Sequence, residues 1–488
     1  MSLWLWIVVG IVVLLVLVAI YDVLQTKHAI LRNFPIIGHL RFILEAFGPE
    51  LRQYIVASND EERPFSRDQR RWVYATSKKE NSYFGFGTDN TFDDDGYLFF
   101  RHSAFPAADE GEGPIPCAKV LGAWRGREHA FRPASLINTS AMSFGSLSGP
   151  AVEAMNRGAA IAGCLQNTGE GGISDHHRHG GELIFQIGTG YFGARGADGA
   201  FSLDALAASA ASANVKAIEL KLSQGAKPGL GGVLPAAKVT KEIAAARGVP
   251  VGITVASPSH HTEFSDVAGL VEFVESIADA TGLPVGIKSA VGDRGFWDEL
   301  AQHMASTQRG PDFVSVDGGE GGTGAAPLLF SDHVALPFRS GFPIVFGAFA
   351  RSGLQHDVVF MGAGKLGFGA DAALALAAGV DMISVGRQAM MAIGCIQAQR
   401  CHTGHCPTGV ATQGKWLQRG LDPTDKAVRL ANYVHGLSDD LRRLSAAMGL
   451  SHPGEISLSE IDVRDSSRGL IDAATYLGVD PSWYSARR

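Results

Sequence analysis

The stretch "PVGIKSAVGDRGFWDELAQHMASTQRGPDFVSVDGG" (residues 284–319) contains one unit of a repeating pattern. A short apolar run, "PVGIKSA", is followed by a polar loop with glycine and a stretch of helix-forming residues, after which a second apolar run, "FVSVDGG", begins. Strands that alternate with helices are typical of parallel sheets, because the helix carries the chain back to the start of the next strand. The stretch therefore predicts an α/β fold.

The same pattern repeats from about residue 135 to residue 387. Eight apolar strands separated by helices predict a (β/α)8 barrel, and a doubly wound open sheet is the alternative. Two further apolar runs, "IFQIG" (residues 184–188) and "ITVASP" (residues 253–258), are expected to be inserts outside the barrel. The eight predicted strands are residues 136–142, 163–169, 217–224, 284–290, 313–319, 343–349, 357–362 and 381–387.

Composition and charge limit the class of protein. With 46% hydrophobic residues and 60 glycines among 488 residues, the chain has the composition of a globular protein with many turns. A net charge of -7 and the lack of a run of Lys and Arg predict no nucleic-acid partner. We expect four segments: a transmembrane anchor (1–22), a membrane-proximal lead-in (23–130), the barrel with a cysteine-containing loop (131–412) and a helical extension (413–488).

The first residues favour a membrane anchor. The run "LWLWIVVGIVVLLVLVAIY" (residues 3–21) has no charge and is long enough to cross a bilayer. Basic residues follow it, which predicts a single span with the N-terminus outside and the body in the cytoplasm. A signal peptide or a buried core helix is the alternative, although "MSLW" lacks the basic residues that begin a signal peptide. Residues 35–55 are expected to form a helix, either on the membrane surface or packed in the protein.

Glycine-rich and polar loops follow the predicted strands, where barrel enzymes carry their chemistry. "SFGS", "EGG", "GAKPGLGG" and "EGGTGAAP" follow the first, second, third and fifth predicted strands. After the seventh and eighth come "GAGKLGFG" (residues 362–369) and "VGR" (residues 385–387), where barrels frequently bind a phosphate. No dinucleotide fingerprint is present, so flavin mononucleotide (FMN) is the expected cofactor. The expected phosphate-binding residues are Gly362, Gly364, Gly367, Gly369, Gly386 and Arg387.

Three of the five cysteines lie close together in "GCIQAQRCHTGHCPTGVATQ" (residues 394–413), as Cys395, Cys401 and Cys406. A disulfide is disfavoured in the reducing cytoplasm. Zinc with His402 or His405 as fourth ligand is possible, although the spacing matches no common zinc finger. Three thiolates also suit a three-iron cluster with one thiolate per iron. Cys117 and Cys164 are expected to be buried residues without a chemical role.

Five motifs in the same order resemble the FMN-binding synthase domain of glutamate synthase, over about residues 131–450. They are "AMSFGS", "NTGEGG", "KLSQGAKPGLGG", "GGTGAAP" and the cysteine motif. The resemblance implies a barrel with FMN and a 3Fe-4S cluster, the cluster bound by the three neighbouring cysteines. It also implies that Ala141, Met142 and Ser143 line the flavin and that Lys288 faces its pyrimidine edge. A structural ion pair is the alternative role for Lys288.

The same resemblance implies a substrate site formed by Glu170, Lys221, Gln224 and Lys227. Donors for two carboxylates and a polar group for a carbonyl suit 2-oxoglutarate or a related 2-oxo acid. The implied reaction is reductive amination with ammonia, in which reduced FMN supplies a hydride and the cluster feeds electrons to the flavin. Structural salt bridges are the alternative for these four residues.

The chain also departs from the pattern of complete glutamate synthases. It has no cysteine before Cys117, so we expect no glutaminase activity on this chain. No NAD(P)H-binding or FAD-binding segment is recognisable, so the electron donor is expected to be a separate ferredoxin or reductase subunit. A homo-oligomer is compatible with the sequence. The alternative function is a membrane-anchored electron-transfer or scaffold subunit with a decayed substrate site.

Overall fold

The computed structural model describes residues 2–25, 28–58, 60–80, 83, 85–108 and 111–484. The chain divides into two compact units, residues 1–71 and residues 72–488. Each unit is described by itself.

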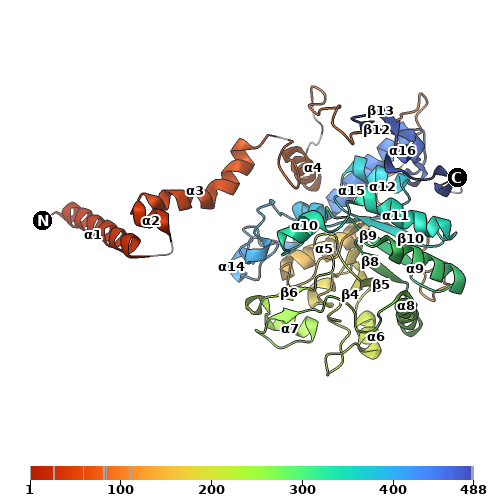
Figure 1. The fold of residues 1–488 in the computed structure, drawn as a ribbon, viewed down its shortest axis with the longest axis horizontal. Helices are drawn as coiled ribbons and strands as arrows, with labels where there is room; N and C mark the ends of the chain where they lie inside the picture. Colours follow the sequence, from red (N-terminus) through yellow and green to blue (C-terminus); the bar gives the residue numbers. More distant parts are fainter. Residues whose placement is uncertain are drawn as a thin grey trace. The chain divides into compact units, whose positions relative to one another are not determined.

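The first unit is helical (Figure 1). It contains α1 (Leu3–Leu24), α2 (Ala29–Asn33), α3 (Gly38–Leu51) and a π-helical turn that continues α3 (Arg52–Val56). Helix α1 is long and apolar enough to cross a membrane, with a mean hydropathy of 3.2. Near its end, the buried Asp22 carboxylate accepts hydrogen bonds from the Ile36 backbone N–H at 2.9 Å and from His39 Nε2 at 2.9 Å. These bonds fix the chain between α1 and α3.

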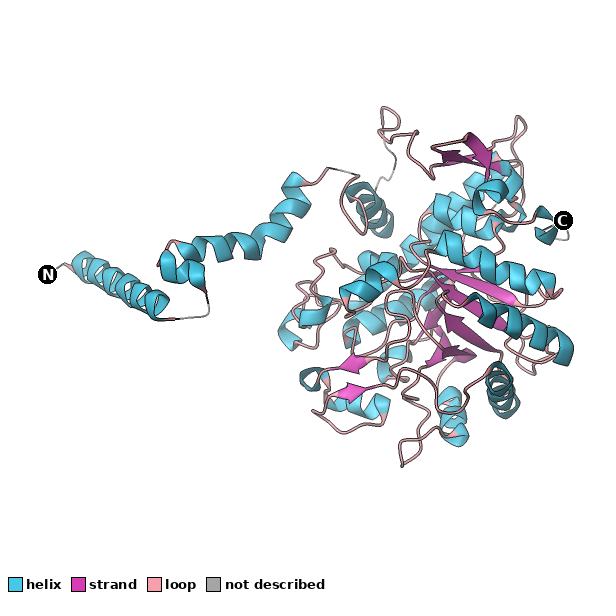
Figure 2. Cartoon of the chain, viewed as in Figure 1, coloured by secondary structure: helices cyan, strands magenta, loops and turns pink. Residues whose placement is uncertain are grey.

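The second unit contains a closed barrel of eight parallel strands surrounded by helices (Figures 1 and 2), which confirms the predicted barrel. Strand β11 pairs with β2 and closes the barrel. The strands, in their order around the barrel, are β2 (Ile137–Thr139), β3 (Leu165–Asn167), β4 (Glu182–Ile187), β5 (Val215–Lys221), β8 (Val285–Ser289), β9 (Phe313–Asp317), β10 (Val359–Ala363) and β11 (Met382–Val385).

Helices follow most of the strands, as the repeating pattern predicts. Several begin with a side-chain cap: Ser148 caps α5, and Asp266 caps α8, each accepting a hydrogen bond from a backbone N–H of the first turn. The helices of the barrel are α5 (Gly149–Ala162), α6 (Leu203–Ala211), α8 (Val267–Thr281), α9 (Arg294–Thr307), α11 (Phe338–Arg351), α12 (Gly369–Ala377) and α13 (Arg387–Ala392).

Two strand predictions were wrong. Residues 343–349, predicted as the sixth strand, lie inside helix α11, where Phe346 and Phe349 pack against Phe360 of β10. Residues 184–188, predicted as an insert, belong to barrel strand β4. A short apolar run cannot be assigned to a strand or to the buried face of a helix from its periodicity alone. The other seven predicted strands are barrel strands.

Outside the barrel are two smaller elements. The run "ITVASP" contains β7 (Val255–Ala256), which pairs with β6 (Val233–Leu234) outside the barrel, as predicted for an insert. Beyond the barrel, helix α15 (Pro423–Ala447) packs on α5 at Gly158, where an added Cβ would come 2.8 Å from the Ala427 carbonyl oxygen. A sheet of β1 (Leu98–Phe100), β12 (Ile461–Asp465) and β13 (Gly469–Asp472) completes the C-terminal part, with α16 (Ala473–Leu477) beside it.

The interior of the barrel is apolar at the end where the strands begin. Cys117 and Leu121, which precede the first strand, belong to one buried cluster together with strand side chains that point into the barrel. Phe131 packs against this cluster. The cluster therefore closes the lower end of the barrel. Its strand residues are Leu165, Ile184, Ala217, Phe313, Val359, Met361 and Met382.

Candidate functional site

A polar layer lies above the apolar cluster of the barrel. In most strands, the residue two positions after the cluster residue points into the barrel and is polar. Because successive side chains of a strand point to opposite faces, residues two apart point the same way. Lys288 follows the same rule, since Gly286 lies two residues before it and a Cβ there would come 2.3 Å from the Phe313 ring. This polar layer consists of Asn167, Gln186, Glu219, Lys288, Ser315 and Ser384.

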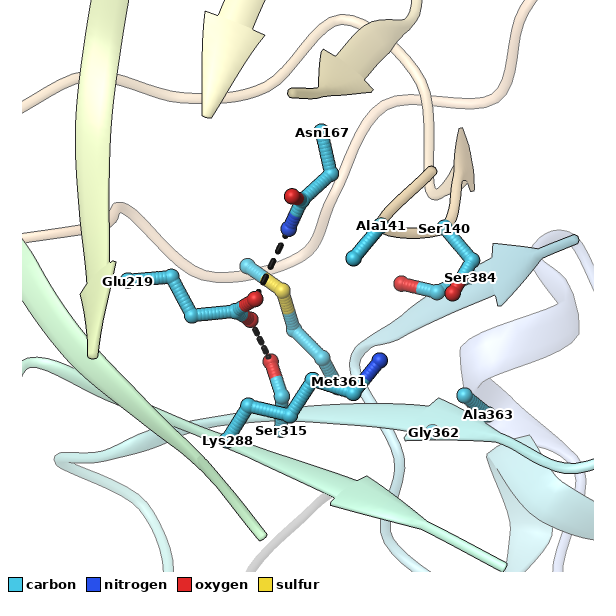
Figure 3. Close-up of a pocket in the computed structure, with 10 residues that line it drawn as sticks. All are labelled: Ser140, Ala141, Asn167, Glu219, Lys288, Ser315, Met361, Gly362, Ala363 and Ser384. Carbon is cyan, nitrogen blue, oxygen red and sulfur yellow. Dashed lines mark hydrogen bonds between the residues drawn. The ribbon is translucent and has the colours of Figure 1, made fainter. Parts of the chain in front are cut away.

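Five of these residues line a pocket at the end where the strands finish (Figure 3). The sixth, Gln186, bonds to Glu219 of the pocket. Barrel enzymes place their active sites at this end. Ala141, from the predicted flavin-lining segment, and Gly362, from the predicted phosphate segment, line the same pocket. The remaining lining residues are Ser140, Met361 and Ala363.

Lys288 is buried in this pocket beside two carboxylates. Its ammonium lies 3.5 Å from Asp317, whose Oδ2 also accepts a hydrogen bond from the Gly225 N–H at 3.0 Å. Burial opposes the positive charge, but the carboxylates of Asp317 and Glu219 outweigh it and raise the pKa of Lys288. The side chain is therefore a buried cation at neutral pH. It forms an ion pair with Asp317, which is the alternative role considered for Lys288 in the sequence analysis.

Glu219 faces Lys288 in the polar layer and was not among the predicted site residues. Its Oε1 accepts hydrogen bonds from Asn167 Nδ2 at 2.8 Å and from Gln186 Nε2 at 2.7 Å, and its Oε2 accepts one from Ser315 Oγ at 2.5 Å. Figure 3 shows the bonds to Asn167 and Ser315. All three donors are neutral, so they stabilise the carboxylate without cancelling its charge.

The structure brings together three of the four predicted substrate residues. Lys221, at the end of β5, places its Nζ 2.8 Å from Glu170 Oε1. Lys227 is close enough to interact electrostatically with both Glu170 and Lys221. Burial opposes the charge of Glu170, but Lys221, and then Lys227 and Arg247, lower its pKa. Burial and the neighbouring Lys221 lower the pKa of Lys227. Together these residues form a buried cluster with more cations than anions.

Gln224, the fourth predicted residue, lies on the loop between Lys221 and Lys227. The glycine that follows it, Gly225, passes so close to the loop after β9 that an added Cβ would come 1.9 Å from the Gly318 carbonyl oxygen. Gly188, after β4, is equally constrained, since its Cβ would come 2.3 Å from Glu170 Oε2. These glycines let neighbouring loops approach one another and the Glu170 side chain.

The buried His261 bonds to the backbone of Lys221, and it was not among the residues predicted from the sequence. His261 Nε2 donates a hydrogen bond to the Lys221 carbonyl oxygen at 3.0 Å, and its Nδ1 lies 3.1 Å from the Tyr191 hydroxyl. That hydroxyl also accepts a hydrogen bond from the Thr262 N–H at 3.0 Å, so it donates to Nδ1. Burial lowers the pKa of His261, which keeps the ring neutral with one nitrogen as donor and the other as acceptor.

The predicted phosphate segment lies between β10 and α13. Helix α12 begins after Phe368, which provides no side-chain cap for its first N–H groups. Gly364 has a φ of +140°, a conformation that favours glycine. Beside Gly367 lies the buried Gln388, whose Nε2 has no hydrogen-bond partner in the part of the chain that the structure describes. Arg387 donates a hydrogen bond to the Glu320 carbonyl oxygen, and burial lowers the pKa of its guanidinium.

The three cysteines lie on an irregular loop that begins directly after α13. Burial, together with the charges that Cys401 and Cys406 would carry, raises the pKa of Cys395 to about 11. The thiols are therefore near neighbours. Gln397 and Gln399 have φ values of +58° and +54°, a conformation uncommon for residues other than glycine. Within the described ranges, no group of three or more His, Cys, Asp or Glu side chains is arranged to hold a single metal ion.

The cysteine loop is fastened to the loops around the pocket. Gln413 Nε2 donates to the carbonyl oxygens of Gly145 and Leu147, in the loop after β2, at 3.1 and 3.0 Å. Lys238 Nζ donates to the Cys401 carbonyl oxygen at 3.3 Å. The cysteine loop is thus joined to the segment that follows Ala141, Met142 and Ser143.

Comparison with known proteins gives consistent matches. A family model described as the conserved region in glutamate synthase matches residues 124–451. The glutamate synthase large subunit-like protein YerD of Bacillus subtilis (strain 168) is 37% identical, over 94% of this chain and 94% of its own length. An archaeal-type glutamate synthase (NADPH) of Thermotoga maritima is 34% identical over 64% of this chain, which spans 59% of that relative.

Similar solved structures include the monotopic membrane protein (S)-mandelate dehydrogenase. It is 14% identical, with a TM-score of 0.44, and the match covers 75% of this chain and 87% of that chain. A mandelate oxidase is 16% identical with a TM-score of 0.42.

Proposed function

The chain belongs to the glutamate synthase family, and on that premise we propose that it is an FMN-dependent oxidoreductase that aminates 2-oxoglutarate, or a related 2-oxo acid, with ammonia. The observation that carries the proposal is the polar layer at the open end of the barrel, where buried Lys288 lies close to the Glu170–Lys221 pair. Cationic side chains and a buried, shaped pocket suit an anionic cofactor and an anionic substrate.

The residues around the pocket fit FMN. The uncapped N-terminus of α12 and Gln388 Nε2, which has no partner among the described residues, offer donors for a phosphate, together with Gly362, Gly364 and the other glycines of that segment. Gly386 and Arg387 complete the segment. Lys288 would face the pyrimidine edge of the ring, and Ala141, Met142 and Ser143 would line it. Bound FMN would supply hydride transfer.

The cluster around Lys221 fits a dicarboxylate. Lys221 and Lys227 would bind carboxylates, Gln224 would donate to the carbonyl oxygen, and Glu170 would orient Lys221 through their 2.8 Å contact. His261 holds the Lys221 backbone in place.

Cys395, Cys401 and Cys406 are proposed to bind a 3Fe-4S cluster, which would pass single electrons to the flavin. Two observations support this proposal. Cys401 and Cys406 are close enough to affect the pKa of Cys395, and Gln397 and Gln399 have positive φ values that turn the loop tightly. A cluster of several irons holds its thiolates farther apart than one ion does, so it suits thiols that do not converge on a single point. The electron donor would be a ferredoxin or a reductase subunit.

The N-terminal unit is proposed to anchor the protein in a membrane. Helix α1 would form a single span, with the barrel in the cytoplasm. Apolar side chains of α3 are exposed at helical spacing, which suits a helix lying on the membrane surface. These side chains are Leu40, Ile43, Leu44, Phe47 and Leu51.

One experiment tests the proposed activity. The flavin-containing full chain is reduced without oxygen by dithionite and then given 2-oxoglutarate and ammonium. Reoxidation of the flavin, with glutamate as product, is expected only when both are present. Reduced flavin that persists with 2-oxoglutarate and with related 2-oxo acids would contradict the proposal and favour an electron-transfer subunit.

A further inference from the structure

Glu219 is an unusual residue for the floor of a pocket that takes anions. It is 1% exposed, lies in the middle of barrel strand β5, and lines the pocket together with Lys288. Lys288 also pairs with Asp317, so its ammonium interacts with both carboxylates. Asp317 in turn interacts with the guanidinium of Arg387.

We infer that ionised Glu219 lowers the reduction potential of the flavin and so opposes Lys288, which raises it. The inference rests on the proposed flavin site. A flavin that takes up two electrons and one proton becomes an anion, which a neighbouring carboxylate destabilises and a neighbouring ammonium stabilises. Glu219 thereby makes the reduced flavin a stronger hydride donor toward an imine. Lys288 stabilises the same anion, so that the electron donor can still reduce the flavin.

Three hydrogen bonds hold the Glu219 carboxylate in place. The donors Asn167, Gln186 and Ser315 lie 2.5 to 2.8 Å from its oxygens. A glutamate needed merely to link the strands could be replaced by glutamine without loss of contacts. The amide oxygen would accept from Asn167 and Gln186, and the amide NH2 would donate to Ser315 Oγ. The charge is the property that glutamine lacks.

Glu219→Gln is therefore the decisive variant, since it removes the charge and retains the contacts. We expect the two-electron midpoint potential of the full, flavin-loaded chain to shift to a more positive value in an anaerobic dye-coupled titration. Ser315→Ala is the matched control, because it removes one of the hydrogen bonds and leaves the carboxylate. Its potential is expected to be unchanged or more negative.

Each outcome decides the inference. A Glu219→Gln potential equal to or below that of the original chain, at matched flavin content, would overturn it. An equal positive shift in Ser315→Ala would overturn it too, because hydrogen bonding rather than charge would then be responsible. If Glu219→Gln does not retain flavin, Glu219→Asn is compared with Glu219→Asp, which has the same length but keeps the charge. Equal flavin potentials in these two variants would reject the inference. An original chain that binds no flavin would instead refute the proposed function.

Discussion

The ammonium of Lys288 lies 3.5 Å from the carboxylate of Asp317, and both residues are buried in the barrel. Asp317 is itself fixed by the Gly225 N–H. The position of the lysine side chain is thus set by strand β9 and by the loop after β5 before any ligand binds.

Lys288→Met should lower the flavin potential while FMN remains bound. The variant removes a positive charge that acts on Asp317 and Glu219, and the proposed phosphate-binding segment is unaltered. A charge-assisted hydrogen bond is worth about 1–3 kcal/mol, so the shift should be measurable by dye-coupled titration. Lys216→Met, at the start of β5, is the control. An unchanged potential would place Lys288 away from the ring.

Lys221→Met should weaken binding of 2-oxoglutarate. It removes the ammonium that lies 2.8 Å from Glu170 and leaves a carboxylate beside the substrate site. The loss of one charge-assisted contact of about 2 kcal/mol corresponds to a KM about 30-fold higher. Lys241→Met, on the exposed surface of α7 (Lys241–Arg247), is the control. A lower melting temperature with an unchanged KM would show that the pair has a structural role alone.

Cys401→Ser should abolish the EPR signal of an oxidised three-iron cluster. Cys117→Ser is the control, because Cys117 lies in the buried cluster at the lower end of the barrel and not on the loop of the three neighbouring cysteines. Burial raises the pKa of Cys117 to about 12, so it is a poor ligand. Equal loss of signal in both variants would reject the assignment of the ligands.

Deletions in the N-terminal unit should separate two kinds of membrane attachment. Removal of residues 1–22 takes away the proposed span and leaves α3 with its exposed apolar face. We expect this variant to sediment with membranes in part and to be released by detergent. Removal of residues 1–58 should give a soluble protein that still contains flavin. Complete solubility after the shorter deletion would show that α3 does not bind the membrane.

Glu275→Gln should lower stability at pH 6 and about half as much at pH 3. Glu275 of α8 contacts Arg125, Arg127 and the Gly310 N–H, and although burial opposes its charge, these groups lower its pKa to about 2. A lowered pKa stabilises the fold above the unfolded value of about 4.3, and this contribution disappears as the pH falls toward 2. The expected difference at pH 6 is about 2–3 kcal/mol.

Urea unfolding of both proteins at the two pH values measures this effect. Glu272→Gln, on the exposed side of the same helix, is the control and should change little. A difference of equal size at pH 6 and pH 3 would mean that the ion pairs do not account for it.

Much of the barrel is visible in the sequence, because its strands are short apolar runs separated by helices and loops. The two errors have one physical cause. The run at residues 343–349 is apolar because it forms the side of α11 that packs on β10, whereas the run at 184–188 forms a strand that is buried on both faces. Burial makes both segments apolar, whatever their backbone conformation.

Part of the candidate site could be proposed from the sequence. The resemblance to the glutamate synthase family implied Glu170 and Lys221 as substrate residues, and the fold brings their side chains into contact, while their role stays a prediction. The predicted residues did not include Glu219 and Gln186, which lie inside strands, or His261, which bonds to a backbone carbonyl. A polar residue two positions after a core residue in several strands was a signal that the sequence contained. The contact between His261 and Lys221 joins residues 40 positions apart, and it depends on the tertiary fold.

Cys117 and Leu121 belong to the buried cluster that fills the lower end of the barrel. A product of the proposed reaction on the polar layer would therefore leave by the opposite end, through which the next reactant would enter. Product and reactant would then compete for the same route.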